Sequence, residues 1–83
     1  MKITVKYFAS IRERIGASSE VVATSAATLA ELRDQLIAQG GAHAESLARG
    51  RTVRMALNQV MSDESVALLD GAEVAFFPPV TGG

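Results

Sequence analysis

The segment TLAELRDQLI, residues 28–37, decides how the rest of this 83-residue chain folds. Thr28 and Glu31 have the spacing of a capping box, in which two side chains bond free backbone N–H groups at the start of a helix. The apolar positions that follow recur at helical spacing: Leu29, Leu32, Leu36 and Ile37. Gly40-Gly41 offers a natural stop. The pattern predicts one amphipathic helix with a single face to bury.

Strand-like segments on both sides of this helix supply the surface that it covers. The predicted strands comprise residues 2–8, 20–23, 52–57, 60–61 and 73–77. In the first of them, Ile3, Val5 and Tyr7 share one face, and we expect the second to pair with it as a hairpin. Asn58-Gln59 and Asp70-Gly71 are turn signals between the later strands.

A shorter helix is predicted between the first two strands. Ser10 and Glu13 repeat the capping-box spacing, and Gly16 is the expected end of this helix. Because one main helix covers only one face of a sheet, we predict an α+β grasp fold, in which a mixed sheet wraps on one main helix with short extra helices. Residues 1–77 are predicted to form this domain, and residues 78–83 an extended C-terminal tail.

Composition excludes several classes of function. The 48% hydrophobic content is that of a folded domain, and no apolar run approaches the ~20 residues of a membrane span. With 8 basic and 9 acidic residues and no basic patch, a nucleic-acid partner is not expected. The absence of cysteine removes disulfides and thiolate sites. The start of the chain lacks a signal-peptide pattern, so a cytoplasmic protein is expected.

The chemical inventory does not assemble an active site. The single histidine, His43, is predicted to be a solvated surface residue. Gly40-Gly41 is not followed by the Gly-Lys-Ser/Thr of a phosphate-binding loop. Neither a nucleophile–base pair nor a metal-ligand cluster can be built, so we expect no metal, no bound cofactor and no catalysis by the chain alone.

The chain ends FFPPVTGG, residues 76–83. Pro78 and Pro79 donate no backbone hydrogen bonds, so sheet pairing is expected to stop there and the chain to leave in a stiff, extended form. Six residues span about 20 Å at ~3.3 Å each, which carries Val80 and Thr81 outward from the domain. Gly82 and Gly83 lack side chains and can enter a slot too narrow for a Cβ. The group delivered is the α-carboxylate of Gly83, which a partner would have to activate.

Two aromatic residues lie out of phase with the buried faces of their strands. Phe8 falls on the side of the lysines of its strand, and Phe77 lies opposite Val74 and Phe76. In a grasp sheet the first and last strands are neighbours, so we expect Phe8 and Phe77 to lie side by side with Met61 nearby. These three residues are candidate anchors for a protein partner, although coverage by a loop of the same chain would also explain them.

The segments ITVKYFA, IRE, ALNQ and LLDGAEVAFFPPVTGG closely resemble those of the small, sulfur-carrier subunits of molybdopterin synthase, the MoaD family. The resemblance covers nearly the whole chain and is weakest over residues 38–54. It implies a ubiquitin-like β-grasp fold, in agreement with the prediction from the residues. It also implies that the family's hydrophobic docking patch falls on Phe8, Met61 and Phe77, with Met61 in place of the usual leucine.

The resemblance implies a mechanism as well. An E1-like adenylyltransferase would join AMP transiently to Gly83, and a sulfur donor would convert this acyl adenylate to a thiocarboxylate. The tail would then enter the large subunit of molybdopterin synthase and give its sulfur to a pterin precursor, with two rounds building the dithiolene. Family members assemble with the large subunit as a two-plus-two heterotetramer.

Other functions share this fold and a Gly-Gly end. A sulfur carrier for thiamine or cysteine biosynthesis is the nearest alternative, and the double-proline tail disfavours it. A ubiquitin-like protein modifier would instead join Gly83 to lysines of other proteins. In a plain β-grasp binding module the terminal glycines would have no role.

Overall fold

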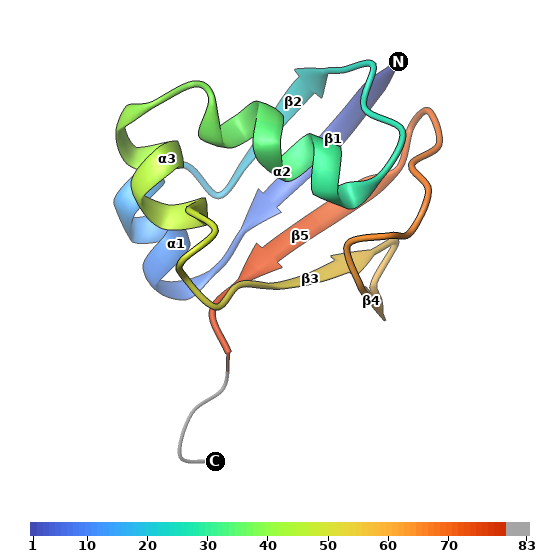
Figure 1. The fold of residues 1–83 in the computed structure, drawn as a ribbon. Coiled ribbons are helices and arrows are strands. Elements are labelled where there is room, and N and C mark those ends of the chain that lie inside the picture. Colours follow the sequence, from blue (N-terminus) through green and yellow to red (C-terminus); the bar gives the residue numbers. More distant parts are fainter. Residues whose placement is uncertain (80–83) are drawn as a thin grey trace.

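The computed structural model describes residues 1–79, which form a five-stranded mixed sheet and three helices (Figure 1). The elements are β1 (Lys2–Tyr7), α1 (Ala9–Ile15), β2 (Ser19–Ala23), α2 (Leu29–Ile37), α3 (Gly41–Leu47), β3 (Arg54–Leu57), β4 (Val60–Ser62) and β5 (Glu73–Phe77). Helix α2 crosses one face of the sheet, and α1 and α3 pack together at one end of it (Figure 1). This arrangement is the predicted β-grasp.

The strand order β2-β1-β5-β3-β4 places the first and last strands side by side in the centre of the sheet. β1 and β5 run parallel, with Tyr7 opposite Phe76, whereas the other pairs are antiparallel. The β3–β4 hairpin turns at Asn58 and Gln59, both of which have positive φ, as a tight hairpin turn requires. The chain therefore enters and leaves its domain along adjacent central strands.

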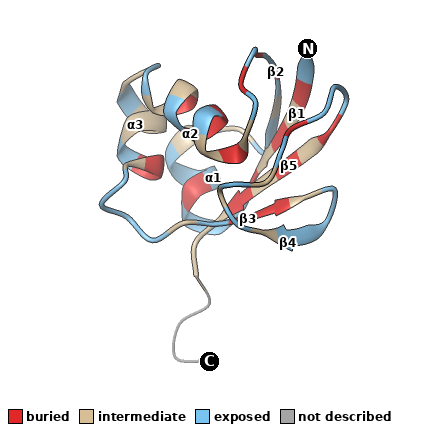
Figure 2. Ribbon diagram, turned by 45° about the vertical axis from the view of Figure 1, so that its right-hand side comes forward, coloured by how far each residue is buried: buried red, intermediate tan, exposed pale blue. Residues whose placement is uncertain are grey.

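The core lies between the sheet and α2, where the buried residues gather (Figure 2). Leu29, Leu32 and Leu36 are fully buried and Ile37 is half-buried, which confirms the predicted stripe. From the sheet, Phe76 stacks on Tyr7 with ring centroids 6.4 Å apart. The start of α2 is capped as predicted, since the Thr28 hydroxyl accepts from the backbone N–H of Glu31, 3.3 Å away.

Three local predictions were wrong. Ser10 does not cap α1, because the chain turns directly out of β1 and the helix begins at Ala9 with Phe8 as an N-cap that makes no side-chain bond. β1 and β2 pair in antiparallel fashion but are joined through α1, so they are no simple hairpin. Gly40, expected only as the stop of α2, also precedes a further helix, α3, that the sequence pattern did not predict. Gly16 does end α1, at φ +84°.

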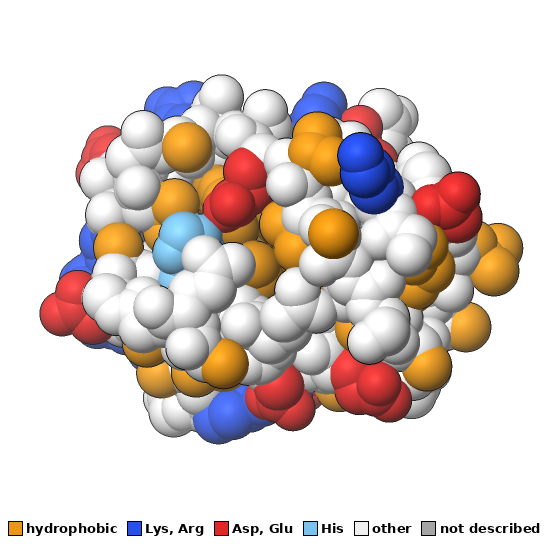
Figure 3. Space-filling model, turned by 90° about the horizontal axis from the view of Figure 1, so that it is seen from above, with side chains coloured by type: hydrophobic (Ala, Val, Ile, Leu, Met, Phe, Trp, Pro, Cys, Tyr) orange, Lys and Arg blue, Asp and Glu red, His pale blue; other side chains and the backbone are white. Residues whose placement is uncertain are grey.

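Within residues 1–79, none of the helices has the length and apolar character needed to cross a membrane. The same residues contain no group of three or more His, Cys, Asp or Glu side chains that could hold a metal ion. On the face seen in Figure 3, acidic and basic side chains are interspersed.

Candidate functional site

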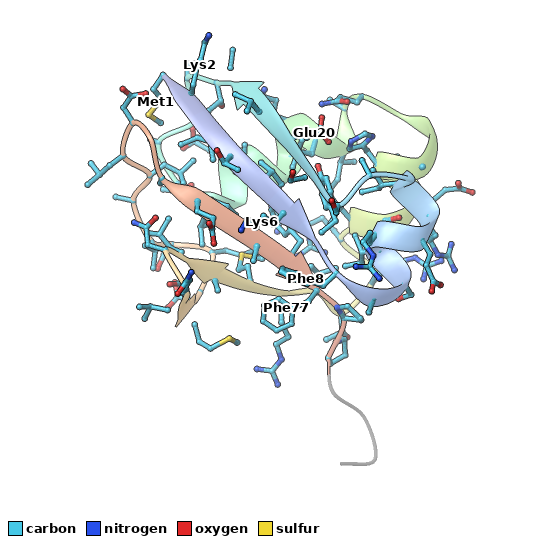
Figure 4. The ribbon with its side chains drawn as sticks, turned by 180° about the vertical axis from the view of Figure 1, so that it is seen from behind. Met1, Lys2, Lys6, Phe8, Glu20 and Phe77 are labelled. Atoms are coloured by element: carbon cyan, nitrogen blue, oxygen red, sulfur yellow. The ribbon has the colours of Figure 1, made fainter. Side chains whose placement is uncertain are left out.

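The candidate site lies where the chain leaves the sheet. β5 ends at Phe77, and Pro78 follows with a half-buried side chain. Because Tyr7 is opposite Phe76 in the parallel β1–β5 pair, Phe8 comes next to Phe77. The Phe8 N–H donates to the Phe76 carbonyl, 3.2 Å away, which fixes this neighbourhood. Figure 4 shows Phe8 and Phe77 together at the start of the tail.

Phe8, Met61 and Phe77 form what we name the apolar patch, on the sheet face opposite α2. Phe8 is 44% exposed and Met61 57% exposed, and Phe77 is half-buried, whereas Phe76 in the opposite phase has no exposed surface. Met61 is reached across β3, because it pairs with Ala56, which in turn pairs with Ala75 beside Phe77. The structure therefore brings the three predicted residues to one face.

Small residues keep the middle of this face low. Ala56 and Ala75 lie between Met61 and β1, whereas the exposed Arg54 pairs with Phe77 on the same face. Farther along the same face, Lys6 and Glu73 pair at 3.3 Å, with both side chains partly exposed. Exposed aromatic and thioether groups around a shallow alanine surface have the character of a protein-binding face. Sequence reasoning missed these two alanines, because their position beside the apolar patch depends on strand register.

On the other side of the tail, Pro78 and Pro79 line a pocket of about 310 Å³. α1 contributes Ser10 and Arg14, the end of α3 contributes Ser46, and the segment before β3 contributes Arg51 and Thr52. We name this the tail-root pocket. The predicted tail residues Val80, Thr81, Gly82 and Gly83 lie outside the described residues.

His43 is not the solvated surface residue that we predicted. Its Nε2 lies 2.8 Å from Glu20 Oε2, and its ring meets Tyr7 edge-on at a centroid distance of 6.0 Å. The Tyr7 hydroxyl donates to the same Glu20 oxygen at 2.6 Å. The cause is α3, which carries His43 back over the end of β1 and the start of β2.

The shared carboxylate shifts the titration of this cluster. Burial acts to raise the pKa of Glu20, but the hydrogen bonds from His43 and Tyr7 outweigh it and lower the pKa below its ordinary value. Burial, with the hydrogen bond to Glu20, raises the pKa of Tyr7. A tyrosine that stays protonated and a carboxylate that stays ionised form a stable hydrogen-bonded unit. With Tyr7 buried and Glu20 and His43 partly exposed, this unit ties α3 to the sheet.

The chain is similar to known proteins over its full length. Residues 5–83 match the model of the ThiS family. The molybdopterin synthase sulfur carrier subunit of Escherichia coli (strain K12) is 42% identical over 81 residues, which cover 98% of this chain and 99% of that protein.

Two solved structures share the fold. SAMP1 from Haloferax volcanii superposes with a TM-score of 0.78 at 27% identity, and the match covers all of both chains. A chain in the complex of subunits 1 and 2 of the molybdopterin-converting factor from Helicobacter pylori 26695 superposes with a TM-score of 0.70 at 28% identity, again over all of both chains. The chain therefore belongs to the ThiS family and, within it, to the molybdopterin synthase sulfur carrier subunits.

Proposed function

We propose that this chain is the sulfur carrier of molybdenum cofactor biosynthesis and that Gly83 carries the sulfur as a thiocarboxylate. The proposal rests on the end-to-end similarity to sulfur carrier subunits of molybdopterin synthase, of which the Escherichia coli protein is 42% identical. The family match also extends to Gly83 itself. A cytoplasmic location is part of the proposal.

The chemistry starts from an unreactive group. An α-carboxylate is ionised at neutral pH and is a poor electrophile. An E1-like partner would let this carboxylate attack the α-phosphate of ATP, which forms the acyl adenylate and releases pyrophosphate. A sulfur donor would then displace AMP at the acyl carbon and leave the thiocarboxylate on Gly83. AMP is thus a transient adduct, and the chain supplies only the carboxylate and its presentation.

The second partner in the proposal is the large subunit of molybdopterin synthase. The Helicobacter pylori relative was solved as a complex of subunits 1 and 2, and we extend that pairing to this chain. Phe8, Met61 and Phe77 would dock on the large subunit while the tail delivers its sulfur to the pterin precursor. The central position of β5 supports this role, because the neighbouring strands on both sides hold the start of the tail in a fixed direction.

The proposal is tested by mass and by reconstitution. Chain purified after coexpression with the activating enzyme and sulfur donor is expected to show one oxygen replaced by sulfur in its intact mass. Mixed with the large subunit and the pterin precursor, this form should yield molybdopterin, whereas the unmodified carboxylate form should not. Product from the carboxylate form alone would contradict the proposal.

A role as protein modifier is the second candidate. It is favoured by the superposition on SAMP1 from Haloferax volcanii, whose full name is small archaeal modifier protein 1. It predicts isopeptide bonds between Gly83 and lysines of other proteins. Peptides that carry the Gly-Gly remnant of this chain, in digests of cell extract, would support it. A role as sulfur carrier for thiamine biosynthesis is the third candidate. Sulfur transfer from the same thiocarboxylated chain into thiamine precursors would support it over the molybdopterin role.

A further inference from the structure

The tail leaves the domain between two unlike surfaces. The apolar patch lies on one side, and the tail-root pocket lies on the other, with Pro78 and Pro79 in its wall. We propose that the tail-root pocket is a second docking element, which receives an acidic side chain of the large subunit as that subunit takes up the tail. This inference rests on the proposed function.

The charge of the pocket is one-sided. Arg14 and Arg51 line it, and none of its lining residues within the described range 1–79 is acidic. Both arginines are exposed, and within residues 1–79 neither lies in an ion pair. Arg12 and Arg54 are likewise outside any ion pair in that range, whereas Arg33 and Arg49 bond to Glu64 and Arg49 also pairs with Asp34; what sets Arg14 and Arg51 apart is that both line one pocket. Two uncompensated guanidinium groups on one pocket favour an anionic occupant, and their planar donor forks match a carboxylate.

The backbone that carries Arg51 is held in place. The buried guanidinium of Arg33 donates to the Arg51 carbonyl at 3.1 Å and to the Ala48 carbonyl at 2.9 Å. Arg14 stands on α1, which packs against α3. Because both arginines start from fixed backbone positions, less ordering is needed when they bind a partner.

The pocket is also lined by serine hydroxyl groups that neither cap a helix nor satisfy a buried group within residues 1–79. Ser10 was predicted as a helix cap, yet α1 begins without a side-chain cap. Ser46 is only 2% exposed, and its Oγ has no hydrogen-bond partner among the described residues. A buried hydroxyl without a hydrogen-bond partner is unfavourable, so this wall of the pocket has bonding capacity that the domain itself does not use. The exposed hydroxyls of Ser10 and Thr52, beside the arginines, extend the set of donors available to a carboxylate.

The position of the pocket identifies the kind of occupant. A protein that encloses the tail must pass Pro78 and Pro79 and therefore meets the pocket wall and the apolar patch together. An acidic side chain at the rim of such a partner would pair with Arg14 and Arg51. A free phosphate ion shares the chemistry but has no reason to be found at the root of a protein-inserted tail.

The test compares charge reversals of equal size. Arg14→Glu and Arg51→Glu are each expected to weaken binding to the purified large subunit at least about tenfold at low salt, with the difference shrinking as salt screens the charges. Lys2→Glu is the matched control, because Lys2 is exposed at the far end of β1 from the tail (Figure 4) and should change the affinity less than about twofold. Arg14→Ala and Arg51→Ala, with melting temperatures, exclude a folding effect.

The outcomes separate this inference from the proposed function. If the unaltered chain binds and Phe77→Ala weakens binding, but both arginine reversals behave like Lys2→Glu, the pocket inference is wrong and the proposed function stands. If the unaltered chain does not bind the large subunit, both fail. A nuclear magnetic resonance titration with inorganic phosphate provides the other arm. Saturable shifts at Ser46 and Arg51, with partner binding unchanged by the arginine variants, would make the pocket a small-ion site and overturn the proposal.

Discussion

Adjacent phenylalanines at the end of β5 are expected to respond in opposite ways to the same change. Phe76 has no exposed surface and stacks on Tyr7, whereas Phe77 is half-buried on the outer face. Replacing a fully buried phenylalanine by alanine costs about 3–5 kcal/mol of stability. In a domain of this size each kcal/mol lowers the melting temperature by about 4–8 °C, so Phe76→Ala should lose about 12 °C or more, or fail to fold.

Phe77→Ala should act mainly on binding. Full burial of a phenylalanine is worth about 1.5–3 kcal/mol, and roughly half of that remains to be gained when a partner covers a half-buried ring. The expected loss is therefore about 0.75–1.5 kcal/mol of binding free energy, or about four- to twelvefold in affinity for the large subunit. The loss of folding stability should be of similar size and much smaller than for Phe76→Ala.

Thermal melts and binding isotherms on both variants give the answer. Leu69→Ala is the control, because Leu69 is 74% exposed and lies next to Asp70, which bonds the first residues of β1 at the other end of the sheet. It should leave both the melting temperature and the affinity unchanged. A Phe77→Ala variant that melts while Phe76→Ala keeps its stability would show that the strand phase is reversed. Unchanged affinity in a folded Phe77→Ala variant would remove Phe77 from the docking surface.

Three further predictions concern the tail, the buried arginine and the Glu20 cluster. Deleting Gly83 retracts the terminal carboxylate by about 3.3 Å, so the rate of pyrophosphate exchange with the activating enzyme should fall about a hundredfold or more. The melting temperature and the binding to the large subunit should stay unchanged. A near-normal exchange rate would contradict this prediction. Arg33→Met should lower the free energy of unfolding in urea by about 3–5 kcal/mol, because it leaves the Leu47, Ala48 and Arg51 carbonyls without donors, and Arg33→Lys should rescue little of it. Since the pKa of Glu20 is lowered in the fold, its contribution is present above the unfolded pKa of about 4.3 and is lost as pH falls through the folded value. Between about pH 6 and about pH 3, the melting temperature should therefore fall less in Glu20→Gln than in the unaltered chain. An equal fall in both proteins would contradict a stabilising role of the ionised Glu20 in this cluster.

Periodic patterns predicted the parts of the fold that bury a continuous face. The stripe Leu29, Leu32, Leu36 is long enough to have only one helical interpretation, and the alternation Ile3, Val5, Tyr7 has only one strand interpretation. Strand phase alone then placed Phe77 opposite Phe76, which the structure shows. The local sequence is therefore sufficient to predict an element when its apolar residues all pack on one buried face.

Where the prediction failed, the deciding contacts come from elsewhere in the chain. Ser10 has good capping chemistry, but the turn out of β1 places the N-cap two residues earlier, at Phe8. Helix α3 has seven residues and begins at a glycine, so it has too few turns for a periodic signal. Because the prediction omitted this helix, it also left His43 in solvent. Arg33 stands among charged residues and would be expected in solvent. It is 5% exposed because the end of α3 and the irregular segment after it present carbonyls that need donors.

The same buried arginine joins the fold to the candidate site. Arg33 leaves α2 and bonds the carbonyls of Leu47, Ala48 and Arg51, so the main helix holds the segment that leads into β3. That segment forms one wall of the tail-root pocket, and β3 is one of the two strands that flank β5. The direction in which the tail leaves the domain thus depends on packing more than thirty residues away in sequence. A substitution at Arg33 that still allows folding should therefore alter delivery of the tail as well as stability, whereas a substitution at Leu69 should alter neither.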